Sequence, residues 1–309
     1  MPQTTDTHTT PALSNSTIAP DTATILREVK RLYADCGLGH LPSIITDTHA
    51  SILRLFRGDM PGYRQSTAPY HDLEHTLSVV LASARLVHGI STTRAVSDDL
   101  FTVAVVAAYF HDTGMLQDET DTTGTGAKHT VGHEDRSIAI MRSLLATHAV
   151  PAHTCDAIAS AIDCTRLALT PADIAFPTPD AKDAGLIVGS ADLIAQLADR
   201  KYLEKLPLLF KEFQEARIPG YVTQRDLFQK TAPFYNNVVR PRLDHDLGAV
   251  TRFMRLHFLH RFGLDHDPYQ HAIDANLGHL RYLLKTTGPN DITTKLRRKN
   301  DVLHVSETV

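Results

Sequence analysis

The 309-residue sequence predicts an all-α protein built around one main domain. Apolar residues recur three or four positions apart in many segments, which is the spacing of an amphipathic helix. No segment alternates apolar and polar residues for long, so no β-sheet is expected. The stretch Phe101 to Phe110 holds ten uncharged residues and predicts a helix that is buried on most of its surface.

The chain divides into three predicted parts. Residues 1–20 are rich in Thr, Ser and Pro and predict a disordered tail. Residues 21–290 predict the all-α domain, and residues 291–309 a polar tail. Within the domain, apolar spacing together with Gly, Pro and capping residues predicts helices near residues 21–36, 42–56, 70–88, 97–112, 134–148, 151–165, 183–200, 201–217, 243–262 and 269–285.

Composition narrows the class of protein. Apolar residues make up 42% of the chain, enough for a substantial core, and the net charge of −4 provides no general basic field for nucleic acid. The three cysteines include no CxxC pair and predict a reducing, cytoplasmic setting. No secretory signal and no membrane span is expected. We therefore expect no nucleic acid and no membrane among its partners, and a homodimer stays open.

Three segments place His or Asp in or beside apolar helices. PYHDLEH contains His71 and His75, which share a face if the segment is helical. His111 and Asp112 follow the apolar stretch, and Asp192 lies inside LIVGSADLIAQ. A buried imidazole and carboxylate cost free energy unless a partner compensates. Each segment alone is more often structural, but all three together predict a divalent metal site.

The order of these residues resembles that of the HD-domain metal-dependent phosphohydrolases, H…HD…D. YHDLEH resembles the YHNxxH motif of the cyclic-nucleotide phosphodiesterase branch, and HEDRS at 133–137 is similar to its NEExS motif. The resemblance covers about residues 70–200. Asp72 and His133 stand where those motifs have Asn, and no second His closely follows the His111–Asp112 pair. The second metal and the substrate therefore stay open.

The resemblance implies a ligand set. His75, His111, Asp112 and Asp192 match the ligands of the first metal, and Asp112 can bridge to a second. His133 is a candidate ligand of that second ion, a residue that supports the ligands, or a helix-start residue. Imidazole and carboxylate suit Fe, Mn, Co, Ni or Zn. One or two ions are expected, with Mg a candidate at the second site.

The resemblance also implies catalytic roles. His71 matches the residue that protonates the leaving oxygen, although it can instead be a structural residue at the helix start. Glu134 matches the acidic residue that orients the attacking water, and Asp112 serves both metal and catalysis. The candidates for substrate binding are Gln196, Arg200 and Lys201. The alternative is that these residues belong to a solvated helix face.

Three functions follow from these residues. The first is hydrolysis of a small-molecule phosphoester, such as a nucleotide or cyclic nucleotide, by metal-activated water. The second is an HD-type diiron oxygenase, which needs more His ligands. The third is a non-catalytic nucleotide-binding sensor that keeps the metal site. Glu134 and the YHxxxH form favour hydrolysis.

Overall fold

The computed structural model describes residues 22–288 and 291–297. Regular structure in these ranges is helical, apart from one isolated bridge between Tyr63 and Asp118, which confirms the all-α prediction. The predicted disordered tail lies outside the described residues. So does most of the predicted polar tail, whose described part holds the 3-10 helix η7 (Ile292–Lys295). No helix in the described ranges is both long and apolar enough to cross a membrane.

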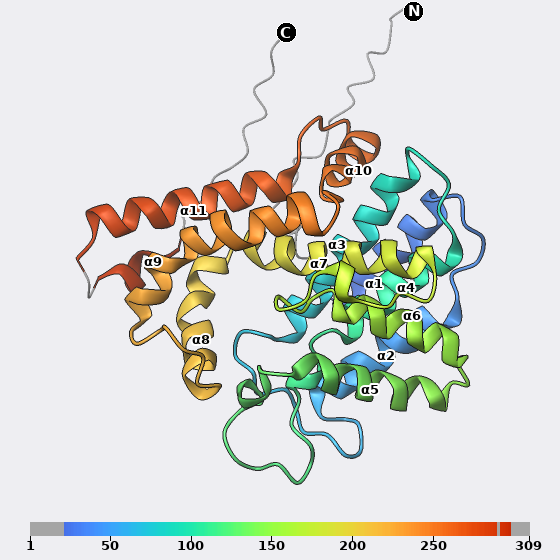
Figure 1. Cartoon of the computed structure of the whole chain (residues 1–309), viewed down its shortest axis with the longest axis horizontal. Helices are drawn as coiled ribbons and strands as arrows, with labels where there is room; N and C mark the ends of the chain where they lie inside the picture. The colour runs from blue at the N-terminus through green and yellow to red at the C-terminus, as the bar shows by residue number, and fades with distance from the viewer. Residues whose placement is uncertain (1–21, 289–290, 298–309) are drawn as a thin grey trace, which may run out of the picture.

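The α-helices are joined by connections of varied length, and the long connections include residues 58–72, 111–132 and 164–178 (Figure 1). In chain order the α-helices are α1 (Thr22–Asp35), α2 (Ser43–Arg57), α3 (Leu73–Ser91), α4 (Asp98–Phe110), α5 (His133–Thr147), α6 (Ala152–Asp163), α7 (Pro179–Ala198), α8 (Tyr202–Glu215), α9 (Gln224–Phe234), α10 (Arg252–Phe262) and α11 (Pro268–Thr286). Shorter segments are the 3-10 helices η2 (Thr113–Met115), η3 (Gly126–His129) and η4 (Pro171–Asp173) and the π-helices η5 (Tyr235–Val239) and η6 (Arg242–Asp246).

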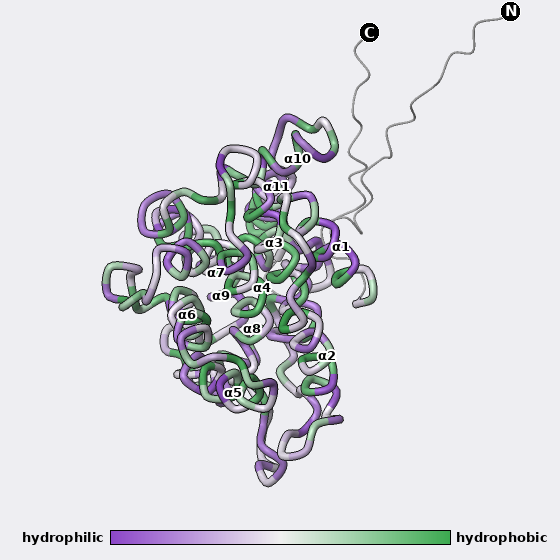
Figure 2. The backbone as a smooth tube through the Cα atoms, turned by 90° about the vertical axis from the view of Figure 1, so that its right-hand side faces the viewer, coloured by the Kyte–Doolittle hydropathy of each residue, from purple (hydrophilic) through white to green (hydrophobic). Residues whose placement is uncertain are grey.

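The centre of the molecule is formed by α3, α4 and α7, which contact one another pairwise. Every residue of α4 from Leu100 to Phe110 is buried, as the apolar sequence predicts. The N-terminus of α4 is capped by Ser97, whose side chain accepts a hydrogen bond from the Leu100 amide at 2.9 Å. Helices α8, α9 and α11 lie on one side of this centre, while α5 and α6 lie on the other (Figure 1). In the view turned by 90°, α10 lies toward the upper end of the molecule and α5 toward the lower end (Figure 2).

The start of α3 differs from the sequence prediction. The helix begins at Leu73, because Asp72 is its N-cap and accepts a hydrogen bond from the His75 amide at 2.8 Å. His71 therefore precedes the helix. The expectation that His71 and His75 share one helical face is wrong.

Gly114 allows a close contact just after α4. The helix ends at Phe110, two residues before the predicted end, and Gly114 lies within η2. A Cβ atom on Gly114 would come within 1.8 Å of the carbonyl oxygen of His133. The missing side chain thus lets the first turn of α5 approach the residues that follow α4.

The C-terminal third contains two further departures. The single helix predicted over 243–262 is broken at Gly248 and Ala249, whose φ angles are 65° and 51°, and α10 begins only at Arg252. α9 was not predicted, and it continues directly into the π-helix η5. The π-helix follows Pro233, whose missing N–H disturbs the regular ladder of hydrogen bonds.

Candidate metal centre

Three central helices bring the four predicted first-metal ligands together. His75 lies in the first turn of α3, and Asp192 lies within α7. His111 and Asp112 directly follow α4. The Nε2 atom of His75 is 3.3 Å from Oδ2 of Asp112 and 3.2 Å from Oδ1 of Asp192. The Nε2 atom of His111 is 3.2 Å and 3.6 Å from the same two oxygens, and 3.3 Å from Nε2 of His75.

These atoms fit the coordination shell of a divalent metal. Nδ1 of His111 lies 2.8 Å from the carbonyl oxygen of Ala108, so Nδ1 carries the proton and Nε2 directs a lone pair to the centre. Oδ2 of Asp112 is buried and forms no hydrogen bond, although two imidazole nitrogens lie close to it. With metal–ligand bonds of about 2.1 Å, two ligands of one ion are separated by about 3.0 to 3.4 Å. Four of the five separations are 3.2 or 3.3 Å and lie within this range, while the separation between His111 and Asp192 is 3.6 Å. His75, His111 and Asp112 form a compact group of possible ligands, and Asp192 contacts the two histidines of that group.

The electrostatics of the ligands couple metal binding to protons. Burial disfavours a charge on His75, but Asp112 and Asp192 outweigh it and raise the pKa of His75 to about 9. Burial also disfavours a charged Asp112, yet His111, His133 and His75 hold the pKa of that carboxyl well below its usual range. A metal ion bound at this centre would have to displace the proton that His75 holds, so its affinity would decrease as the pH falls.

The position of Asp192 depends on small residues in α7. A Cβ atom on Gly189, one turn before Asp192, would lie 2.6 Å from the carbonyl oxygen of Cys164. The helix therefore approaches the end of α6 more closely than a side chain would allow. This approach keeps the Asp192 carboxylate, whose side chain is 16% exposed, at the level of His75 and His111.

His133 reaches the second oxygen of Asp112. Its Nε2 atom lies 3.3 Å from Oδ1 of Asp112, and its Nδ1 atom lies 2.8 Å from the carbonyl oxygen of Thr130. His133 is also the first residue of α5. Ser137 joins the same helix to the ligands, because its hydroxyl donates to the His111 carbonyl and accepts from the Gly114 amide.

Glu134 is held by a network for which the sequence carries no signal. Its Oε2 atom lies 3.6 Å from the guanidinium of Arg166, which also binds Asp163 at 2.7 Å. The buried Arg242 donates to three backbone carbonyls in the segment 164–169 and fixes the backbone that carries Arg166. Residues far apart in the sequence thus set the position of Glu134.

His71 has a buried partner, Glu212, which the sequence also does not reveal. Oε2 of Glu212 lies 2.6 Å from Nδ1 of His71. Oε1 accepts from the amides of Tyr70 and His71 at 2.8 and 3.3 Å. Glu212 is fully buried in α8, and the rings of His71 and His75 are 5.8 Å apart. A lone Glu in an amphipathic helix is usually exposed, so only the tertiary contact identifies it.

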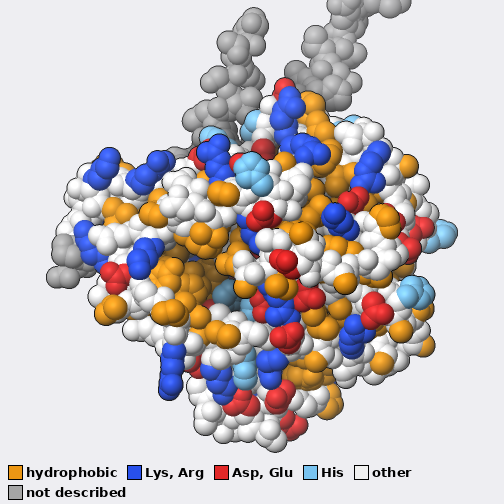
Figure 3. Space-filling model, viewed as in Figure 1, with side chains coloured by type: hydrophobic (Ala, Val, Ile, Leu, Met, Phe, Trp, Pro, Cys, Tyr) orange, Lys and Arg blue, Asp and Glu red, His pale blue; other side chains and the backbone are white. Residues whose placement is uncertain are grey.

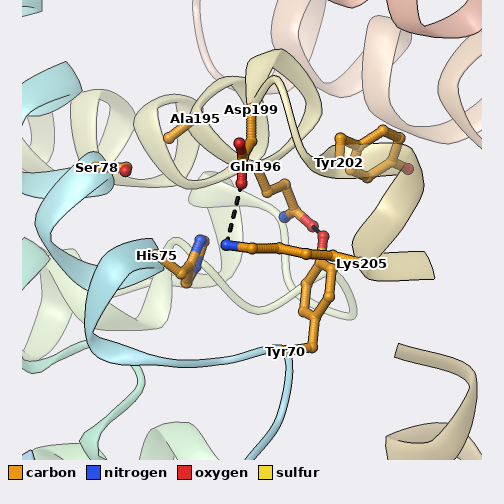
Figure 4. Close-up of a pocket in the computed structure, with 8 residues that line it drawn as sticks. All are labelled: Tyr70, His75, Ser78, Ala195, Gln196, Asp199, Tyr202 and Lys205. Atoms are coloured by element: carbon orange, nitrogen blue, oxygen red, sulfur yellow. Dashed lines mark hydrogen bonds and ion pairs between the residues drawn. The ribbon is translucent and has the colours of Figure 1, made fainter. Parts of the chain in front are cut away.

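A small pocket lies beside the metal ligands (Figure 4). Gln196 lines it and accepts a hydrogen bond from the Tyr70 hydroxyl at 3.0 Å. Lys201 is more exposed and forms an ion pair with Glu74 at 3.0 Å, while Arg200 lies in the turn between α7 and α8. Histidine side chains are visible on the floor of a hollow on the face shown in Figure 3. The pocket residues are Tyr70, His75, Ser78, Ala195, Gln196, Asp199, Tyr202 and Lys205.

Comparison with known proteins identifies a family. A family model described as Npun_R2479-like matches residues 58–254. A search of curated proteins found no match. The matched range is well over half of the chain, and it includes every metal-ligand candidate described above. The chain belongs to the Npun_R2479-like family.

Proposed function

We propose that this protein is a metal-dependent phosphohydrolase of the HD-domain type. The observation that carries this proposal is the convergence of His75, His111, Asp112 and Asp192 on one point, with Oδ2 of Asp112 buried and without a hydrogen bond. The order of these residues, which resembles that of HD-domain phosphohydrolases, supports the same choice. A divalent metal held there polarises a phosphoryl oxygen and lowers the pKa of water.

His71 is suited to act as the general acid. Glu212 contacts its Nδ1 atom at 2.6 Å, which fixes the orientation of the ring and leaves Nε2 to give a proton to the leaving oxygen. The Glu212 carboxylate also accepts two backbone N–H groups and is therefore fixed in place. A structural residue at the helix start would need no buried carboxylate partner.

Glu134 is suited to orient the attacking water. It lies in the first turn of α5 next to His133, which contacts Asp112. The guanidinium of Arg166 lies 3.6 Å from Oε2 of Glu134 and limits the movement of that side chain. The proposed substrate is a small-molecule phosphoester, a nucleotide or cyclic nucleotide, with no nucleic acid or membrane as partner. Free cysteines at 36, 155 and 164 support a cytoplasmic location.

An activity screen tests the proposal. Protein stripped by a chelator and reloaded with Mn²⁺, Fe²⁺, Co²⁺, Ni²⁺ or Zn²⁺ is assayed on bis(p-nitrophenyl) phosphate and on nucleotides. We expect turnover that depends on the metal. His71→Ala should keep the metal and lose about 100-fold or more in kcat. His129→Ala is the control, because the ring of His129 contacts the loop residue Asp121. This variant should change neither the metal content nor kcat. If the wild type releases no product with any of these metals, the phosphohydrolase proposal is wrong. If His71→Ala retains full turnover, the general-acid role of His71 is wrong.

An HD-type diiron oxygenase is the second candidate function. The contact between His133 and Oδ1 of Asp112 supports it, because a carboxylate that bridges two ions needs a further ligand on its second oxygen. Two iron atoms per chain and oxygen consumption without phosphate release would favour this candidate. Nucleotide binding without either reaction would instead favour the sensor.

A further inference from the structure

The pocket beside His75 is formed where α3, α7 and α8 meet. Figure 4 shows Lys205 extending from α8 toward His75, with its ammonium next to Asp199. The metal centre lies next to this pocket, since His75 belongs to both. A substrate whose phosphoryl group is at the metal would therefore place a neighbouring part of its structure in the pocket.

Lys205 is surrounded by carboxylates. Its Nζ atom lies 3.0 Å from Asp199, 3.3 Å from Glu74 and 3.9 Å from Asp72. The Lys205 side chain is only 12% exposed. Burial disfavours its charge, but the three carboxylates outweigh burial and raise the pKa of Lys205. The ammonium thus stays protonated, and the surrounding carboxylates already balance its positive charge.

Carboxylates outnumber ammonium groups in the ion-pair cluster around Lys205. This cluster contains the carboxylates of Asp72, Glu74 and Asp199 and the ammonium groups of Lys205 and Lys201, which also binds Glu74. A second anionic group of a substrate would have to displace a carboxylate from Lys205 or lie beside one. Either outcome is unfavourable in a partly buried site, where charges are poorly screened.

The hydrogen-bonding groups of the pocket suit neutral hydroxyls instead. Oε1 of Gln196 accepts from Tyr70, so the amide NH₂ group is left to donate. An ammonium has three N–H donors, and two of those on Lys205 point to Asp199 and Glu74. Asp199 supplies an acceptor next to these donors. A carboxylate of this kind recognises ribose hydroxyls in dinucleotide-binding proteins.

We propose that the Asp199–Lys205 pair is a specificity determinant that selects phosphoesters carrying one phosphoryl group on a neutral, hydroxyl-bearing organic group. Esters with a second or third phosphate are disfavoured. This assignment rests on the proposed phosphohydrolase function, because it assumes that a phosphoryl group lies at the metal. Asp199 and Lys205 contact the non-reacting part of the substrate.

Binding of two non-hydrolysable ligands to the Mn²⁺-loaded full chain tests the proposal. The ligands are analogues of adenosine 5′-monophosphate and adenosine 5′-triphosphate in which CH₂ replaces each bridging oxygen. Titration calorimetry should show that the monophosphate analogue binds at least about tenfold more tightly than the triphosphate analogue. Equal affinities, tighter binding of the triphosphate analogue, or no binding of either would overturn the assignment.

Two variants separate the roles of the paired charges. Asp199→Asn releases Lys205 from its nearest carboxylate and should shift the preference about tenfold toward the triphosphate analogue. Lys205→Met should weaken both ligands and keep the preference for the monophosphate. The control Asp183→Asn changes a carboxylate on α7 that binds Arg94 outside the pocket, and should match the wild type. An unchanged preference in folded Asp199→Asn contradicts the proposal.

The outcomes for the pocket and for the reaction are distinct. The predicted ligand preference without turnover of any phosphoester would retain the pocket assignment and reject the phosphohydrolase. Turnover together with equal binding of the two analogues would do the reverse. Calorimetry on the metal-loaded protein therefore gives a result that does not depend on catalysis.

Discussion

At the scale of single residues, three histidines around the site are held in the same way, by a contact of Nδ1. In each, Nδ1 contacts an acceptor outside the centre and so fixes the orientation of the ring and of Nε2. The acceptors of His71, His111 and His133 are, in that order, the carboxylate of Glu212, the Ala108 carbonyl and the Thr130 carbonyl. Only the acceptor of His71 is a side-chain carboxyl group, and His71 is the residue proposed to donate a proton to the leaving oxygen.

Glu212→Gln tests this difference between the acceptors. An amide still fills the buried space but no longer offers a negative charge to the protonated His71, so kcat should fall about 10- to 100-fold. Metal content should change little, because Glu212 contacts none of the candidate metal ligands. KM should also change little, because the amide oxygen of Gln can still accept from the backbone amides of Tyr70 and His71. Glu215→Gln, one turn away and bound to Thr125, is the matched control and should retain kcat. Steady-state kinetics measure kcat for both variants. Equal kcat values for Glu212→Gln and Glu215→Gln would contradict the proposed role of Glu212.

At the scale of secondary structure, His133 and Glu134 are positioned by the close approach of the α5 backbone to η2. The first turn of α5 lies against η2 because Gly114 has no side chain, and Ser137 connects the two segments through hydrogen bonds. This contact brings His133 to Asp112 and Glu134 to the edge of the site. The geometry of the centre therefore depends on how α5 docks as much as on the ligands themselves.

Gly114→Ala should disturb this docking. The added methyl group would lie within 1.8 Å of the His133 carbonyl, so α5 has to shift and the free energy of unfolding should fall by about 2 kcal/mol or more. Gly278→Ala is the control, since a Cβ atom there meets nothing within 4 Å and alanine favours a helix. Urea unfolding of the two variants measures the difference. Equal stabilities would show that the approach of α5 can relax without cost.

The whole molecule shows which features can be predicted from the sequence. The buried α4 was predictable, because the apolar run that ends in His111–Asp112 is a local pattern. His75 and Asp192 were named from the order of the motifs, and the structure places both beside that pair. The start of α3 was not predictable, because the Asp72 side chain competes for the helix terminus. Glu212 and the supports of Glu134 depend on contacts between distant helices, which no local pattern records. The interruption at Gly248 and Ala249 arises from backbone angles that apolar spacing does not reveal.

The central claim is that His75, His111, Asp112 and Asp192 together hold a metal ion. Elemental analysis of protein reconstituted with Mn²⁺, Fe²⁺ or Zn²⁺ and then dialysed tests it most directly. His111→Ala is the test variant, and His153→Ala, which changes an exposed histidine on α6, is the matched control. We predict at least one tightly bound ion per chain in the wild type and in His153→Ala, and loss of that ion in folded His111→Ala. Absence of bound metal in the wild type, or the same metal content in His111→Ala, would contradict the claim.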